Sequence, residues 1–247
     1  MVKLTHRRTT LVAAKRVNVM TREKFNQIYH RAAERKGGEL NLEQLLTTPL
    51  NNEQLKLIPD HRWLAEFTQK VFQCGIRWQV VRNKWPAFEQ AFFEFDIEKM
   101  GLMPTEMWER KAQDASIIRD LKKVMTIPEN ANMIHRAALE YGSFSTMVAD
   151  WPEQDIVGLW LYLKKNGCRL GGKTGAYSLR GLGKDSFLFT QDVEAYLRHT
   201  DIIDGGRDTL KSLRAAQNAF NHWQQQSGRS LTQISQIIAF SVGDNRV

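Results

Sequence analysis

Cysteine and long apolar runs are scarce in this chain of 247 residues. The only cysteines are Cys74 and Cys168, which excludes a disulfide framework, a four-cysteine zinc site and a cysteine-ligated iron–sulfur cluster. Every apolar stretch is interrupted by charges before it reaches the roughly 20 residues that a membrane-spanning helix needs. We therefore expect a protein of the reducing cytoplasm, associated with the nucleoid if the source is bacterial, with no membrane segment and no metal site.

Acidic residues are absent from the first 22 positions, which hold six lysines and arginines. The whole chain has 35 Lys and Arg against 27 Asp and Glu, a formal net charge of +8. This balance favours a polyanionic partner, nucleic acid first, although a basic protein without such a partner is the alternative. Residues 1–20 are interpreted as a basic arm that contacts DNA, with an organellar transit peptide as the other interpretation.

Alternating runs of β-branched residues are also lacking, and apolar residues recur instead at helical spacing. Phe25, Ile28 and Ala32 mark a first helix that begins at Thr21 and stops at Lys36, before two glycines. Later segments repeat this pattern with a cap at one end and glycine or proline at the other. The sequence predicts an all-α fold, one helical array over residues 21–247, with two lobes flanking a substrate cleft.

Two helix starts are predicted from capping residues. Asn41 is the expected cap of a short second helix, and Asp60 the expected cap of a helix over residues 61–74. The apolar face of that longer helix is expected to hold Trp63, Phe67, Val71 and Cys74.

A glycine-rich stretch lies between two helical segments, in an element predicted to span residues 155–197. It reads GCRLGGKTG, from Gly167 to Gly175. A glycine hairpin that opens a helix directs backbone N–H groups outward together and can bind phosphate. The run also satisfies the spacing of a nucleoside-triphosphate-binding loop, but a helix rather than a strand precedes it, which disfavours that class.

The hairpin, the helix after it and Asp192 in FLFTQDVEAYL resemble the helix-hairpin-helix DNA glycosylases. Residues 71–100 and 116–134 are similar to corresponding segments of the DNA-3-methyladenine glycosylase I family. The two likenesses occur in the family's order and together cover roughly residues 63–197. The resemblance implies a monomeric enzyme without a cofactor that acts on double-stranded DNA containing damaged bases.

The resemblance also implies a role for individual residues. Asp192 would assist cleavage of the glycosidic bond, by stabilising positive charge on the sugar or steering water, or else it only caps the next helix. The flipped base would enter a pocket built by Trp78, Lys70 and Phe72, with Trp85 as a weaker stacking candidate; core packing is the alternative for each aromatic. The residues expected to hold the DNA backbone are Lys164, Lys165, Arg169, Leu170, Gly171, Gly172, Lys173, Thr174, Gly175 and Lys184.

Three departures from the family pattern bear on the substrate and the chemistry. The chain lacks the terminal cysteines of the family's zinc site, and LIPDHRW stands where the family has a tyrosine motif. Lys70 falls at the family's base-contacting glutamate, eight residues before Trp78, so it would repel a cationic base unless it only extends to solvent. Lys173 precedes Asp192 by 19 residues, a spacing that resembles the glycosylase/lyases of the superfamily.

The sequence thus predicts a base-excision DNA glycosylase that hydrolyses the N-glycosidic bond of a damaged, alkylated purine of the 3-methyladenine type. One alternative is a glycosylase/lyase in which the Lys173 amine attacks the sugar. The simpler interpretation of Lys173, in a phosphate-binding hairpin, is that it only binds a phosphate. The other alternative is a DNA-binding protein that keeps the hairpin and has lost the chemistry.

Overall fold

The computed structural model describes residues 23–242, and this part of the chain is helical, with no strand. The predicted all-α fold is confirmed. The α-helices are α1 (Phe25–Arg35), α2 (Glu39–Leu45), α3 (Asn52–Lys56), α4 (Asp60–Gln73), α5 (Trp78–Ala91), α6 (Ile97–Leu102), α7 (Thr105–Ala112), α8 (Leu121–Val124), α9 (Thr126–Tyr141), α10 (Phe144–Asp150), α11 (Ile156–Asn166), α12 (Lys173–Gly181), α13 (Gln191–His199), α14 (Leu210–Ser227) and α15 (Leu231–Val242). Two short 3-10 helices are η1 (Phe93–Phe95) and η2 (Glu153–Asp155).

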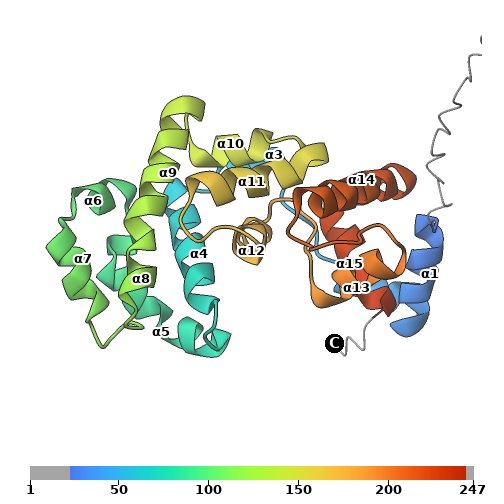
Figure 1. Ribbon diagram of the computed structural model, residues 1–247, viewed down its shortest axis with the longest axis horizontal. Helices are drawn as coiled ribbons and strands as arrows, with labels where there is room; N and C mark the ends of the chain where they lie inside the picture. Colours follow the sequence, from blue (N-terminus) through green and yellow to red (C-terminus); the bar gives the residue numbers. More distant parts are fainter. Residues whose placement is uncertain (1–22, 243–247) are drawn as a thin grey trace, which may run out of the picture.

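The helices form two groups joined by a middle section (Figure 1). One group, the first lobe, holds α4 to α9, and α4 packs against α5, α9 and α12. The other group, the second lobe, holds α1 and α13 to α15, so that it combines the two ends of the described chain; α15 packs against α1, α13 and α14. Helices α10 to α12 lie between the lobes, and α12 occupies the centre of the molecule (Figure 1).

The apolar periodicity correctly identified the core faces of several helices. Phe25, Ile28 and Ala32 are buried on α1, and α4 buries Trp63 and Phe67 together with Val71. Cys74 does not belong to this face: it follows the last residue of α4 and is exposed, because Gly75, at φ +75°, turns the chain away there.

Both predicted caps are wrong, Asn41 by three residues and Asp60 by one, for a tertiary reason in the second case. Helix α2 begins at Glu39 with Gly38 as its N-cap, so that Asn41 lies inside it. Asp60 is the first residue of α4 rather than its cap. Its carboxylate accepts hydrogen bonds from the backbone N–H groups of Phe144 (3.0 Å) and Ser145 (3.2 Å), at the start of α10. Asp60 thus ties α4 to α10.

The predicted basic arm over residues 1–20 lies outside the described residues. Within residues 23–242, no helix is long and apolar enough to cross a membrane.

Candidate DNA-binding and base-excision site

The glycine hairpin joins α11 to α12 as the sequence predicts. Gly172 is the N-cap of α12 at φ +59°, and Arg169 also has a positive φ, of 57°, so the backbone turns sharply just before the helix. The N–H groups of residues 171–174 have no hydrogen-bond partner among the described residues. Together with the positive end of the α12 dipole, they make the hairpin suitable for an oxyanion such as a DNA phosphate.

Two hairpin residues have an internal role instead. The Gly175 N–H donates to the Leu170 carbonyl oxygen (3.2 Å), and the Leu170 side chain is buried. A Cβ atom on Gly175 would lie only 2.5 Å from that oxygen, so only glycine fits at this contact. The Gly175 N–H is therefore not free to bind a phosphate, contrary to the prediction, and the buried Leu170 side chain helps to shape the hairpin.

Lys184 is not part of the DNA-facing surface, which corrects a second prediction. Its side chain is 1% exposed, and Nζ donates to the carbonyl oxygens of Ala149 (3.2 Å) and Trp151 (3.1 Å) at the end of α10. Burial lowers the pKa of this amine. The basic residues that remain exposed around the hairpin are Lys164, Lys165, Arg169 and Lys173.

The segment between α12 and α13 is fixed on α15. The Asp185 carboxylate accepts from the N–H groups of Leu231 (3.0 Å) and Thr232 (2.8 Å), which begin α15, and the Leu188 N–H donates to Ser235 Oγ (3.1 Å). Residues 187–189 are buried. This anchoring holds the start of α13, and therefore Asp192, in a fixed place.

Asp192 lies in the first turn of α13 and is partly exposed. The helix cap is Thr190, whose Oγ1 accepts from the Val193 N–H (3.2 Å), so Asp192 is not needed as the cap. No hydrogen bond or ion pair engages the Asp192 carboxylate within residues 23–242. The position thus leaves the carboxylate available for a ligand.

A cavity of about 210 Å³ opens between α4, the start of α5 and the start of α12. We call it the Trp78 pocket; its lining consists of Lys70, Gln73, Cys74, Trp78, Lys173, Thr174 and Tyr177. Trp78 is 50% exposed and meets the Tyr177 ring edge to face, with the ring centroids 6.4 Å apart. An exposed indole beside a cavity can stack on a flat base. Two of the predicted pocket residues, Trp78 and Lys70, are thus brought together, and Lys173 of the hairpin joins them.

Two other aromatics belong to the core. Phe72, predicted to line the pocket, is fully buried and packs on Phe88 with centroids 4.7 Å apart. It lies on the opposite side of α4 from the cavity, because its neighbours Lys70 and Gln73 face the pocket. Trp85 stacks between Phe88 and Phe95, with centroids 5.4 Å away in each case, so it too serves packing.

Lys70 is held by a carboxylate that the sequence did not single out. Its Nζ lies 3.2 Å from Glu66 Oε1, one turn earlier on α4, and 5.8 Å from the centroid of the Trp78 ring. Burial raises the pKa of Glu66, and the charge of Lys70 opposes that rise. Gly181 on α12 makes room for this carboxylate, since a Cβ there would lie 2.3 Å from Glu66 Oε1. Lys70 therefore stays beside the pocket instead of extending freely into solvent.

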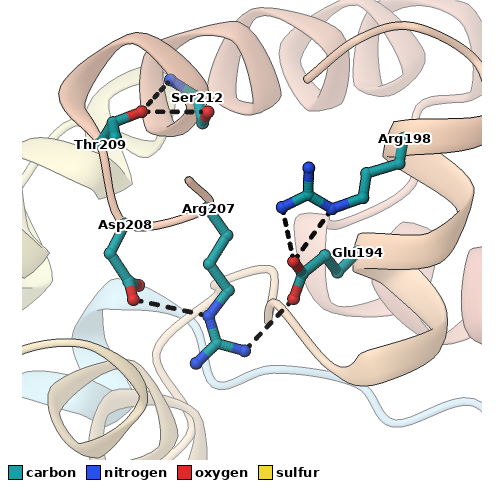
Figure 2. A network of polar contacts seen from close by, with 6 residues as sticks. All are labelled: Glu194, Arg198, Arg207, Asp208, Thr209 and Ser212. Atoms are coloured by element: carbon teal, nitrogen blue, oxygen red, sulfur yellow. Dashed lines mark hydrogen bonds and ion pairs between the residues drawn. The ribbon is translucent and has the colours of Figure 1, made fainter. Parts of the chain in front are cut away.

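A polar network on the second lobe also escaped the sequence analysis. Glu194 on α13 pairs with Arg198 (2.8 Å) and Arg207 (3.3 Å), and Arg207 also approaches Asp208 (3.5 Å), as Figure 2 shows. These contacts lower the pKa of Glu194, the Arg198 hydrogen bond most strongly. Arg207 lines a second, smaller cavity of about 40 Å³ that it shares with Lys173 and Trp160, with room for only a few water molecules. Glu194 and Arg198 are four residues apart on α13, whereas the contact with Arg207 joins residues outside one helix and depends on tertiary structure.

Comparison with known proteins gives a family match and a fold match. Residues 58–165 match the methyladenine glycosylase family model. The fold is similar to that of the 8-oxoguanine glycosylase/lyase of Methanocaldococcus jannaschii, solved with DNA containing 8-oxoguanine, at 13% identity and a TM-score of 0.51, over 87% of this chain and 96% of that one. The 3-methyladenine DNA glycosylase I of Staphylococcus aureus matches at 20% identity and a TM-score of 0.46, over 59% of this chain and 84% of that one. A search of curated protein sequences finds no significant match.

The described residues therefore have an all-helical fold similar to that of the 8-oxoguanine glycosylase/lyase. Residues 58–165, less than half of the chain, match the methyladenine glycosylase family model, and the predicted resemblance to that family is confirmed. The matched segment contains α4 and α5, which supply Lys70, Gln73 and Trp78 to the pocket. It ends before the hairpin and therefore does not include Asp192. The roles of the hairpin and of Asp192 thus depend on the geometry described above.

Proposed function

We propose that this protein is a base-excision DNA glycosylase that hydrolyses the N-glycosidic bond of a damaged purine flipped out of duplex DNA. The observation that supports this most is the position of Lys173, which belongs both to the hairpin with its unpaired N–H groups and to the lining of the Trp78 pocket. A DNA phosphate on the hairpin would bring the neighbouring nucleotide next to a cavity with an exposed indole. The family match makes a methylated purine the first substrate to test.

In this mechanism the chain acts through three groups of residues. The N–H groups of residues 171–174 and the exposed side chains of Lys164, Lys165 and Arg169 bind the backbone beside the lesion. Trp78 stacks on the flipped base, which keeps it out of the duplex. The Asp192 carboxylate faces the sugar as the glycosidic bond breaks, where it stabilises positive charge at C1′ or directs the attacking water.

The test separates binding from chemistry with the Asp192→Asn variant, which keeps the size of the side chain and removes its charge. We expect the rate of base release from methylated duplex DNA to fall at least about a hundredfold, while DNA affinity measured by fluorescence anisotropy stays the same. Asp204→Asn is the matched control, since Asp204 is exposed and pairs only with Lys211 on the surface. Equal base release by wild type and Asp192→Asn would refute the role of Asp192.

A second candidate is a glycosylase/lyase, and the exposed Lys173 amine favours it, because Lys173 lines two cavities and has no ion pair among residues 23–242. The neutral Nζ amine would attack C1′ as the bond to the base breaks and its electron pair leaves with the base. A proton then passes from Nζ to the ring oxygen O4′ as the C1′–O4′ bond breaks, and the product is an iminium. Borohydride would reduce that iminium and trap a covalent complex. Trapping by wild type and by Lys99→Gln, but not by Lys173→Gln, supports this candidate, and no trapped species with any released lesion contradicts it.

We also propose that the protein acts as a monomer in the cytoplasm, in contact with double-stranded DNA, and that the basic residues 1–20 add to this contact. Light scattering of the free protein and of its complex with a short duplex tests the stoichiometry, for which we expect one chain per site. Deletion of residues 1–20 should weaken binding at low salt and have little effect at high salt.

A further inference from the structure

The Trp78 pocket contains an unused hydrogen-bond acceptor. Gln73 is 6% exposed, it lines the cavity, and its Oε1 has no hydrogen-bond partner among residues 23–242. A buried carbonyl oxygen without a hydrogen-bond partner is unfavourable, so such atoms usually meet a ligand or water. Gln73 therefore offers an acceptor, beside the amide N–H₂ donors of the same group, to whatever fills the pocket.

Lys70 offers a donor on the same side of the cavity. Lys70 and Gln73 are three residues apart on α4, so their side chains leave the same face of the helix. The ion pair with Glu66 lies at 3.2 Å and keeps the Lys70 amine beside the Trp78 ring, and an ammonium group has three N–H bonds, so Lys70 has donors left for a ligand. A base stacked on Trp78 would thus have its edge close to one donor and one acceptor.

The charge of the pocket selects against a cationic base. The lining includes two lysines, Lys70 and Lys173, and no acidic residue; Glu66 is the single carboxylate paired with this group. Like charges a few ångströms apart in a partly desolvated site repel each other strongly. A nucleotide methylated at N3 of adenine or N7 of guanine carries a positive charge on the base, whereas 8-oxoguanine and hypoxanthine are neutral.

We propose that the Trp78 pocket prefers a neutral purine lesion that presents a carbonyl oxygen next to a ring N–H, as 8-oxoguanine and hypoxanthine do, to a cationic methylated purine. The carbonyl oxygen accepts from Lys70 Nζ, the ring N–H donates to Gln73 Oε1, and Trp78 stacks on the ring. Normal guanine has the same edge at O6 and N1, but it must first leave its pair with cytosine, which opposes flipping more than for a lesion. This inference rests on the glycosylase function proposed above and specifies its substrate class.

Nucleosides test the pocket without the need for catalysis. Calorimetric titration of the full chain with inosine and 8-oxoguanosine, both neutral, and 7-methylguanosine, a cation, should show at least about tenfold tighter binding of the neutral pair. Lys70→Glu should reverse this preference, and Gln73→Met should weaken the neutral nucleosides while it leaves the cation unchanged. Lys99→Glu is the matched control on α6, outside the pocket, and should change neither.

Base release is then measured on single-lesion duplexes that contain 8-oxoguanine, hypoxanthine, 3-methyladenine or 7-methylguanine. This experiment distinguishes the preference for a neutral lesion from the glycosylase function on which it rests. Faster release of either neutral lesion supports the inference and shows which of the two is the substrate. Release of the methylated bases alone, or tighter binding of 7-methylguanosine by wild type, overturns the inference and leaves the glycosylase function intact. Binding of the neutral nucleosides without release of any base contradicts the glycosylase function instead.

Discussion

Lys184 shows how a single residue can hold the site without touching DNA. Its amine is buried under the end of α10 and satisfies two carbonyl oxygens, of Ala149 and Trp151, that end a helix and have few other donors in reach. One residue later, Asp185 caps α15. Lys184 thus attaches the segment that leads to Asp192 to the end of α10, and Asp185 attaches it to the start of α15.

The first prediction concerns Lys184→Met, which keeps the volume of the stem and removes the donor. We expect the free energy of unfolding to fall by about 1–3 kcal/mol, because two buried carbonyl oxygens lose their partner. DNA affinity of the folded protein should stay the same. Urea unfolding measures the stability, and fluorescence anisotropy measures the DNA affinity. A loss of affinity without a loss of stability would contradict the structural role of Lys184 and support direct contact with DNA.

For single residues, the sequence predicted locations that follow from local spacing along the chain. It did not predict locations and contacts that depend on tertiary packing. Trp78 and Lys70 were correctly brought to one pocket, because both lie at fixed spacing in a family segment. Phe72 was misplaced, since its direction depends on the packing of Phe88 on the neighbouring helix. Gln73 and Glu66 were missed, because an unpaired amide and a buried carboxylate are visible only once the pocket is formed.

The hairpin is the element that we propose binds the DNA backbone, and its shape requires glycine at position 175. The Gly175→Ala variant would place a methyl group against the Leu170 carbonyl oxygen and the Leu163 side chain. We expect a loss of stability of about 1–3 kcal/mol and weaker DNA binding, as the turn opens and the N–H groups of residues 171–174 lose their common direction.

Gly101→Ala is the control for that variant, since Gly101 lies in α6 with open space at its Cβ and no positive φ. Alanine should raise stability there by about 0.5–1 kcal/mol, because it restricts the unfolded chain and favours the helix. Equal effects of the two substitutions in urea unfolding and anisotropy would contradict the close contact in the hairpin.

Glu23 joins two elements that are distant in the sequence, α1 and α13. Its carboxylate accepts from Arg31 Nη2 (3.1 Å) and from the Tyr196 hydroxyl (2.8 Å), and the Arg31 hydrogen bond is the largest cause that lowers its pKa below the ordinary 4.5. The unfolded chain therefore takes up this proton more readily than the folded protein does. The resulting stabilisation is present above pH 4.5 and is lost as pH falls through the lower, folded-state value.

We predict that Glu23→Gln lowers the free energy of unfolding by about 0.5–1 kcal/mol near pH 7, since the site is partly open to solvent. The difference from wild type should shrink as the pH falls below 4.5. Urea unfolding at several pH values measures this. A difference that is constant from pH 7 to pH 3 would contradict the assigned pKa shift.

Helix order and type were predictable at the scale of elements, and two helix boundaries were not. The three- and four-residue spacing of apolar residues predicted α1 and α4, because periodicity is a local property, although α1 begins at Phe25 and not at Thr21. Asp60 was taken for a cap of its own helix, whereas its carboxylate caps α10, which only the folded chain brings close.

At the scale of the whole molecule, the central helix α12 connects the parts of the site. The hairpin and the start of α12 carry unpaired N–H groups, Lys173 and Tyr177 line the Trp78 pocket with residues of the first lobe, and the segment after α12 leads to Asp192 in the second lobe. In the proposed mechanism, backbone binding, base recognition and chemistry therefore lie on elements that are fixed relative to one another. Sequence alone could predict the order of these parts, but not that the lysine of the hairpin also reaches the pocket.

The most direct test of the glycosylase function is identification of the free bases released from a duplex DNA pool treated with alkylating, oxidising and deaminating agents. Mass spectrometry of the small molecules released by the full-length protein requires no prior choice of lesion. We predict at least one damaged purine base, released in proportion to enzyme and time, that is absent with Asp192→Asn and present with Asp204→Asn. A protein that binds the same DNA tightly but releases no base from the pool would contradict the account and establish a non-enzymatic DNA-binding protein.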